Sequence, residues 1–168
     1  YNNPNDPFIG NPDGDTVLVE FFDYNCGYCK RAATALFELA DKDPDLKIVF
    51  KELPILSPAS RTAAKAALAS HKQGKYFEFH AELMTFQGRM SDPVLYKTAE
   101  NVGLDVDQLK IDMESPEVEA MLTQTASVAM RLGVSGTPAF MVGDEFLPGA
   151  VPLPRLEAAI ATARAELN

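Results

Sequence analysis

The chain has 168 residues, of which 46% are apolar and 23% are charged, and its formal net charge is −9. These proportions are ordinary for a globular protein, and the length suits one domain with a core, or a core plus an insert. The negative charge and the absence of a Lys/Arg cluster argue against nucleic acid as a partner. No apolar run approaches the roughly 20 residues of a membrane span, and no signal peptide is visible.

The first part of the chain predicts a strand, a helix and a second strand. Residues 1–15 are rich in Asn, Pro, Asp and Gly, which indicates an irregular leader with a short extended piece near Phe8. Residues 16–22 favour a strand that is buried on both faces. A helical pattern begins near Cys26 and ends before Pro44. Residues 46–53 favour a second strand, which we expect to be parallel to the first because a helix joins the two.

Helical patterns then follow one another from about residue 58 to residue 132. Ser115-Pro116 has the form of an N-cap followed by proline in the first turn, and so does Asp92-Pro93. Strand character returns at residues 138–142, and a turn leads into a second strand at 145–147. A last helix is expected to begin near Pro152 or Pro154. The predicted order is therefore βαβ, a helical block and ββα.

The two cysteines of the chain, Cys26 and Cys29, lie together where the first strand gives way to the first helix. The unpaired N–H groups and the positive dipole at a helix N-terminus favour a thiolate. A disulfide that closes so short a loop contributes roughly 2 kcal/mol at best, so reactivity explains the pair better than stability. We expect Cys26 to be the exposed nucleophile and the more buried Cys29 to resolve the mixed disulfide.

Two other interpretations of the pair are a zinc site and a structural disulfide. Structural zinc usually takes four ligands, and the chain has no other cysteine. His71 and His80 lie in the predicted helical block and are expected to be structural histidines with satisfied ring nitrogens. A non-catalytic redox switch or metal-binding module that uses the same Cys-x-x-Cys is the alternative to an enzyme.

The element order resembles the thioredoxin fold, and a helical block between its halves resembles the DsbA-like branch of that superfamily. The strings FFDYNCGYCK (residues 21–30) and GVSGTPAF (residues 133–140) are similar to bacterial DsbA-family thiol–disulfide oxidoreductases, with a likeness to the ScsC/Com1-type subgroup. The resemblance implies an α/β thioredoxin fold with a mixed sheet. It implies a thioredoxin-like domain over residues 1–57 and 133–168 and an inserted all-helical domain over residues 58–132.

The resemblance also implies roles for residues outside the cysteine pair. Thr137-Pro138 would form a cis peptide beside the disulfide, and the backbone of Thr137 would pair with an extended substrate. Judged alone, Pro138 could equally be a trans proline that starts a strand. Glu20 would lie beneath the disulfide with a raised pKa and exchange protons with Cys29, unless it points to a solvated sheet edge. Apart from the resemblance, Tyr28 is a candidate for substrate contact, with packing as the alternative.

Members of the family are exported and make, break or shuffle disulfides in the periplasm, so we expect a periplasmic or cell-envelope protein. The implied partners are unfolded or misfolded exported proteins with cysteines and a redox partner protein. The family uses no bound cofactor beyond the redox-active disulfide. The best-known oxidases have Pro-His between the cysteines and Val before the cis-proline, whereas Gly27-Tyr28 and Thr137 are more like DsbC-type isomerases and reductases.

Isomerases of this kind are usually oligomers, and ScsC relatives trimerise through an N-terminal arm. Such an arm would precede Tyr1, which in place of Met indicates a processed start. We therefore expect that this chain can be monomeric even where the full-length protein is a homo-oligomer.

Overall fold

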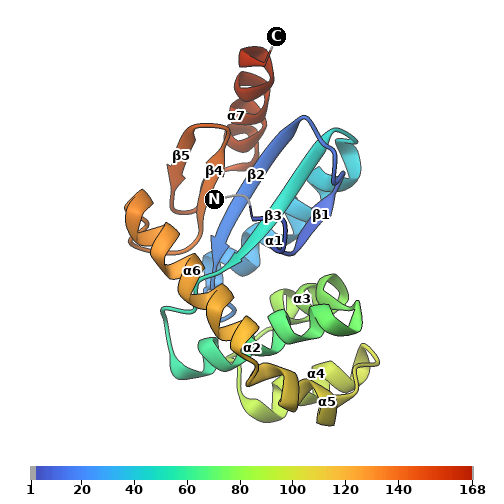
Figure 1. The fold of residues 1–168 in the computed structure, drawn as a ribbon. Helices are drawn as coiled ribbons and strands as arrows, with labels where there is room; N and C mark the ends of the chain where they lie inside the picture. The colour runs from blue at the N-terminus through green and yellow to red at the C-terminus, as the bar shows by residue number, and fades with distance from the viewer. Residues whose placement is uncertain (1–2, 168) are drawn as a thin grey trace.

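A single mixed sheet forms the centre of the computed structural model, which describes residues 3–167 (Figure 1). Tyr1, from which a processed start was inferred, lies outside the described residues. The strands are β1 (Phe8–Gly10), β2 (Thr16–Phe22), β3 (Leu46–Glu52), β4 (Ala139–Val142) and β5 (Glu145–Pro148). The helices are α1 (Gly27–Lys42), α2 (Pro58–Ser70), the 3-10 helix η1 (His71–Gln73), α3 (Tyr76–Thr85), α4 (Asp92–Asn101), α5 (Val106–Met113), α6 (Pro116–Leu132) and α7 (Leu153–Glu166).

The strand order is β1-β3-β2-β4-β5, which places β2 at the centre of the sheet. The predicted parallel pairing of β2 with β3 is confirmed, and β4 pairs antiparallel with β2 on its other side. The predicted hairpin of β4 with β5 is confirmed as well. The α/β class, with βαβ and ββα units around a helical block, is thus the one that the sequence predicts.

The short extended piece expected near Phe8 in the N-terminal leader is confirmed, and it forms an edge strand of the sheet. β1 pairs antiparallel with β3, and the amide of Phe50 donates to the carbonyl oxygen of Pro7. Just before β1, the carboxylate of Asp6 forms a buried ion pair with Lys51. The leader is therefore held to the sheet by tertiary pairing, which its Asn- and Pro-rich composition does not signal.

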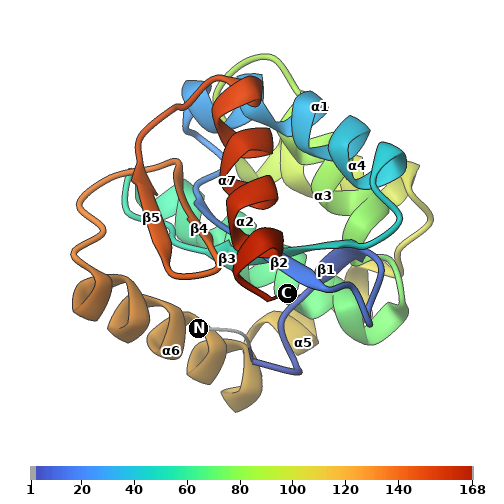
Figure 2. The ribbon, with the colours of Figure 1, turned by 90° about the horizontal axis from the view of Figure 1, so that it is seen from above.

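The two faces of the sheet are covered by different helices, as seen from above in Figure 2: α1 and α7 lie on one face and α6 on the other. Alternate side chains of β2 follow this division. Leu18 and Phe22 pack in the core that contains residues of α1 and α7, whereas Val19 and Phe21 pack with Val128 of α6. The unbroken apolar run of β2 reflects its burial on both faces.

Helices α2 to α5 lie beyond one end of the sheet (Figure 1). The capping signals are confirmed at the start of α6, where Ser115 is the N-cap, and at its end, where Gly133 adopts a left-handed conformation. For α4 the N-cap is Ser91 rather than Asp92. The division into domains at residues 57/58 and 132/133 stays a prediction. None of the helices within residues 3–167 combines the length and apolar character needed to cross a membrane.

The buried ion pair of Asp6 and Lys51 leads to a stability prediction. Asp6→Ala leaves the Lys51 ammonium group buried without its carboxylate, and it should lower the free energy of unfolding by about 3 to 5 kcal/mol. Urea unfolding of the oxidised protein measures this change. The double variant Asp6→Leu/Lys51→Met should recover most of the loss, because a packed apolar pair replaces a charged one. A loss below about 1 kcal/mol for Asp6→Ala would mean that water reaches Lys51.

Candidate active site

The turn between β2 and α1 brings the two cysteines to the first turn of a helix. Cys26 is the N-cap of α1, and its sulfur lies 3.1 Å from the amide nitrogen of Cys29, which donates to it. The amide of Cys26 donates to the carbonyl oxygen of Asp23, and the amide of Asn25 donates to the Asp23 carboxylate. The chain is thereby folded into a tight turn that aims the helix N-terminus at the Cys26 sulfur.

Cys26 and Cys29 form a disulfide with their Cα atoms 5.2 Å apart. Cys29 is fully buried, as expected, but Cys26 has only 5% of its surface exposed and is less open than the sequence suggested. The loop before β4 covers it, since the Cys26 sulfur lies 3.4 Å from the carbonyl oxygen of Thr137. The residues between the cysteines are exposed, and the side chain of Arg31 lies over the ring of Tyr28 at 4.3 Å.

The cis peptide expected at Thr137-Pro138 is confirmed. It lies directly before β4 and next to the disulfide, as the contact of the Thr137 carbonyl with Cys26 shows. Pro138 is buried and Thr137 is half-buried. The Thr137 hydroxyl has no hydrogen-bond partner among the described residues. The contact of Thr137 with substrate, and that of Tyr28, stays a prediction.

Glu20 is a buried carboxyl in the middle of the central strand. Its side chain is fully buried, which excludes the solvated-edge alternative, and neither carboxyl oxygen has a partner within residues 3–167. Strand alternation places it on the α1 face between Leu18 and Phe22, which share a core cluster with both cysteines. Burial raises the pKa of Glu20 to about 8. The residue can therefore hold a proton near neutral pH, on the side of the sheet where the disulfide lies.

A second buried glutamate, Glu52, lies at the end of β3 and was not among the predicted site residues. The hydroxyls of Tyr24 and Tyr76 donate to the same oxygen of Glu52 over 3.0 Å and 2.8 Å, and Tyr24 is 2.8 Å from Nδ1 of His80. Burial raises the pKa of Glu52 well above its usual value and lowers that of His80 to about 3. This group of four residues is the buried polar cluster.

The sequence gives little indication of the buried polar cluster. Glu52 is the last residue of β3 and follows a lysine, whereas Glu20 stands inside an apolar run, so the strand pattern does not mark Glu52 as buried. Tyr76 and His80 lie four residues apart on α3, but no sequence spacing links them to Tyr24 in the β2–α1 turn or to Glu52. His80 is structural, as expected, but Nε2 of its ring has no partner among the described residues, so the expectation that it is satisfied was wrong for that atom.

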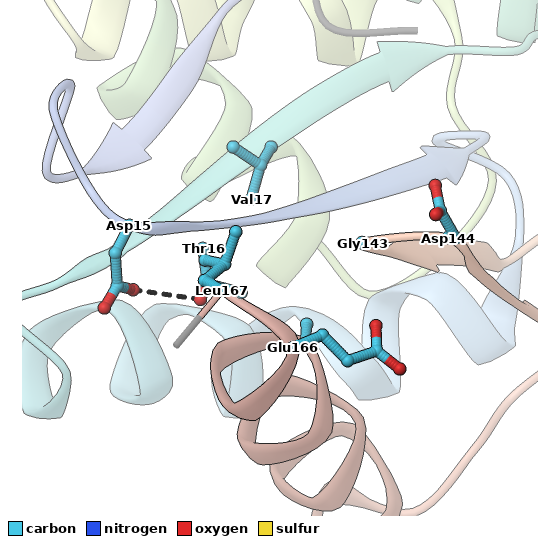
Figure 3. A pocket seen from close by; sticks show the side chains of 8 residues that line it. Asp15, Thr16, Val17, Gly143, Asp144, Glu166 and Leu167 are labelled. Atoms are coloured by element: carbon cyan, nitrogen blue, oxygen red, sulfur yellow. Dashed lines mark hydrogen bonds between the residues drawn. The ribbon is translucent and has the colours of Figure 1, made fainter.

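A surface hollow of about 570 Å³ lies at the other end of β2 and takes no part in this chemistry (Figure 3). Asp15 and Thr16 line it at the start of β2, with Asp144 from the β4–β5 turn and Glu166 from the end of α7. The Thr16 hydroxyl donates to Asp15. Within residues 3–167, no group of three or more His, Cys, Asp or Glu side chains is arranged to hold a metal ion.

The isolation of Glu20 leads to a prediction about stability and pH. The raised pKa means that the folded protein keeps a proton there that the unfolded chain releases above about pH 4.5. Glu20 therefore costs no stability below pH 4.5, and its cost grows as the pH rises toward 8. The free energy of unfolding of Glu20→Gln, minus that of the unmodified protein, should increase across this window by up to about 4 to 5 kcal/mol. Urea unfolding at several pH values measures it, and a constant difference would contradict the assignment.

Comparison with known proteins places the chain in a family. The model of the DSBA-like thioredoxin domain matches residues 17–161. A thioredoxin-like oxidoreductase from Silicibacter pomeroyi DSS-3 is 47% identical, with a TM-score of 0.95 over 97% of this chain and 94% of that one. The thiol-disulfide exchange protein alpha-DsbA2 from Wolbachia pipientis is 32% identical, with a TM-score of 0.88 over 94% and 86%. The catalytic domain of Proteus mirabilis ScsC is 30% identical, with a TM-score of 0.88 over 98% and 92%.

Curated relatives include much longer proteins. The Na(+)/H(+) antiporter NhaA 1 of Salinispora arenicola (strain CNS-205) is 30% identical over 156 residues, which make up 92% of this chain and 24% of that protein. The chain therefore spans about a quarter of the length of such relatives. Fold, disulfide and comparisons agree that this chain belongs to the family of DsbA-like thioredoxin-domain thiol–disulfide oxidoreductases.

Proposed function

We propose that the chain exchanges disulfides with cysteines of exported proteins, with Cys26 as the attacking residue. The observation that carries this proposal is the Cys26–Cys29 disulfide at the N-terminus of α1, against the backbone of Thr137. Family membership supports the reaction class, and the exported substrates rest on the relatives. One of these, from Salmonella enterica serovar Typhimurium, is described as a periplasmic thioredoxin-like protein.

In the reducing direction, the Cys26 thiolate attacks one sulfur of a substrate disulfide. A Cys26–substrate disulfide forms, and the other substrate sulfur leaves as a thiolate that takes a proton from water. The helix N-terminus and the amide of Cys29 stabilise the negative charge on Cys26 before the attack. The N–H of Thr137 and its carbonyl then offer an extended substrate one backbone pairing position.

Cys29 resolves the mixed disulfide by attacking Cys26, which releases the substrate cysteine. Cys29 is fully buried and must lose its proton before it attacks. Because water cannot readily reach it, the proton acceptor has to be a group inside the protein. Glu20 is the acceptor we propose, because it lies on the same face of the sheet and burial raises its pKa to about 8. In the oxidising direction the same steps run backwards, and Glu20 returns the proton to Cys29.

The direction of turnover and the setting of the protein complete the proposal. Gly27-Tyr28 and Thr137 favour isomerase or reductase activity over pure oxidation, by their likeness to DsbC-type proteins. A periplasmic or cell-envelope location, a redox partner protein and a homo-oligomeric full-length form fit that activity. The alternative, a redox switch without turnover, would use the same disulfide.

Equilibration in glutathione buffers followed by alkylation tests whether the pair is a redox centre. The midpoint should be reversible and lie between roughly −270 and −120 mV, the span of related couples. In the reduced protein, Cys26 should be alkylated first, because Cys29 is fully buried. Cys29→Ser should accumulate the mixed disulfide with a protein substrate, while Cys26→Ser forms none. A reduced pair that resists alkylation until a chelator is added would instead indicate a metal-binding module.

Two refolding assays separate the directions of turnover. The reduced protein should restore activity to scrambled ribonuclease. The oxidised protein should restore activity to reduced ribonuclease at a lower rate. The opposite order of rates would identify an oxidase. Thr137→Val tests the basis of this assignment, because valine is the residue of the oxidase pattern and has nearly the volume of threonine. The substitution should raise the rate with reduced ribonuclease relative to the rate with scrambled ribonuclease.

A further inference from the structure

The residue before the nucleophile, Asn25, binds the helices that lie beyond the sheet. Its side-chain oxygen accepts a hydrogen bond from the backbone amide of Met90 over 2.8 Å. Its side-chain nitrogen donates to the hydroxyls of Ser57 and Ser60, at 3.1 Å and 3.2 Å, at the start of α2. Neither contact is with a cysteine. The amide group of Asn25 therefore fixes the loop that ends at Met90 relative to Cys26.

The residue after the resolving cysteine binds the other end of the same loop. The ammonium group of Lys30 donates to the carbonyl oxygen of Phe86 over 2.6 Å and approaches that of Gly88 at 3.5 Å. The same nitrogen lies 5.3 Å from the centre of the Phe86 ring. The loop Phe86–Met90, between α3 and α4, is thus tied to both ends of the cysteine motif. We call residues 86–90 the motif-bound segment.

The motif-bound segment is anchored at its ends and exposed between them. Met90 is buried in the core and Phe86 is half-buried, whereas Gln87, Gly88 and Arg89 are exposed. Gly88 has a φ of 125°, which a residue with a side chain rarely adopts. The three exposed residues are therefore held in one backbone conformation by the hydrogen bonds of the segment with Asn25 and Lys30.

We propose that the motif-bound segment forms part of the surface that polypeptide substrates contact, and that Asn25 is the positioning residue that holds it there. This inference rests on the proposed function. Cys26 has 5% of its surface exposed, so a substrate sulfur reaches it only through a narrow opening. The carbonyl of Thr137 contacts the Cys26 sulfur on one side. Asn25 directly precedes Cys26 in the chain, and its side chain holds the Met90 end of the motif-bound segment.

A small dithiol and a polypeptide use this opening differently. Dithiothreitol needs only to bring one sulfur to Cys26, whereas a cysteine within a peptide brings flanking residues that must lie on the surrounding surface. A displaced segment should therefore slow the peptide more than the small dithiol, because fewer of the peptide's contacts are preorganised. The ratio of the two rate constants isolates this effect from any change in the reactivity of the disulfide itself.

The test measures second-order rate constants for reduction of the oxidised, full chain by a two-cysteine peptide, which leaves as a peptide disulfide, and by dithiothreitol, which leaves as its cyclic disulfide. Asn25→Ala should lower the peptide-to-dithiothreitol ratio about tenfold. Asn25→Asp should retain the ratio, because its carboxylate still accepts from the Met90 amide and from the serine hydroxyls, while its charge changes both rate constants together. Ser60→Ala is the matched control, since Ser57 still binds Asn25, and its ratio should change less than twofold.

Hydrogen exchange provides a readout that does not depend on turnover. In folded Asn25→Ala, the Met90 amide loses its acceptor and should exchange at least tenfold faster, while amides in β2 keep their protection. A peptide-to-dithiothreitol ratio within twofold of the unmodified protein in Asn25→Ala would overturn the inference, and so would a Met90 amide that stays protected. An unmodified chain that reacts with dithiothreitol but with no peptide would contradict the proposed function instead, and it is measured first.

Discussion

The hydrogen bond from the Cys29 amide to the Cys26 sulfur is the interaction on which the site depends. It makes a sulfur the cap of α1, in a position that an oxygen of Ser, Thr, Asn or Asp usually occupies. The cap exists because the turn before it is folded by Asp23, whose carboxylate accepts from the amides of Asn25 and Leu56. The helix then places its partial positive charge at the atom that has to carry a negative charge during disulfide exchange.

Each of the three residues before Cys26 joins this turn to a different part of the protein. Asp23 binds the segment after β3, Tyr24 binds Glu52 and His80, and Asn25 binds α2 and Met90. The helical block is therefore connected to the reactive sulfur by hydrogen bonds as well as by packing. The two buried glutamates have different roles in this region. Glu20 has no partner and is suited to hold a proton, whereas Glu52 accepts from two tyrosine hydroxyls and supports the turn through Tyr24.

Sequence patterns were sufficient where local chemistry decides the structure. The apolar run of β2, the proline and glycine signals around α6 and the Cys-x-x-Cys at a strand–helix junction each predicted their element. The cis peptide at Thr137-Pro138 followed from family resemblance rather than from local preference. The patterns failed where distant segments meet. β1 pairs with β3 through long-range contacts, and Cys26 is covered by the loop at Thr137. The ties of Asn25 and Lys30 to residues 86–90 likewise join segments that no spacing relates.

The placement of the tyrosines has a consequence for spectroscopy. The chain has no tryptophan and five tyrosines, so its near-ultraviolet emission comes from phenol rings alone. Tyr28 lies between the two cysteines and is 60% exposed, while Tyr24 lies two residues before Cys26 and donates to a buried carboxyl. Disulfides and carboxylates both quench tyrosine fluorescence. The exposed Tyr28 and the buried Tyr24 are therefore intrinsic fluorescent probes of the region around the disulfide.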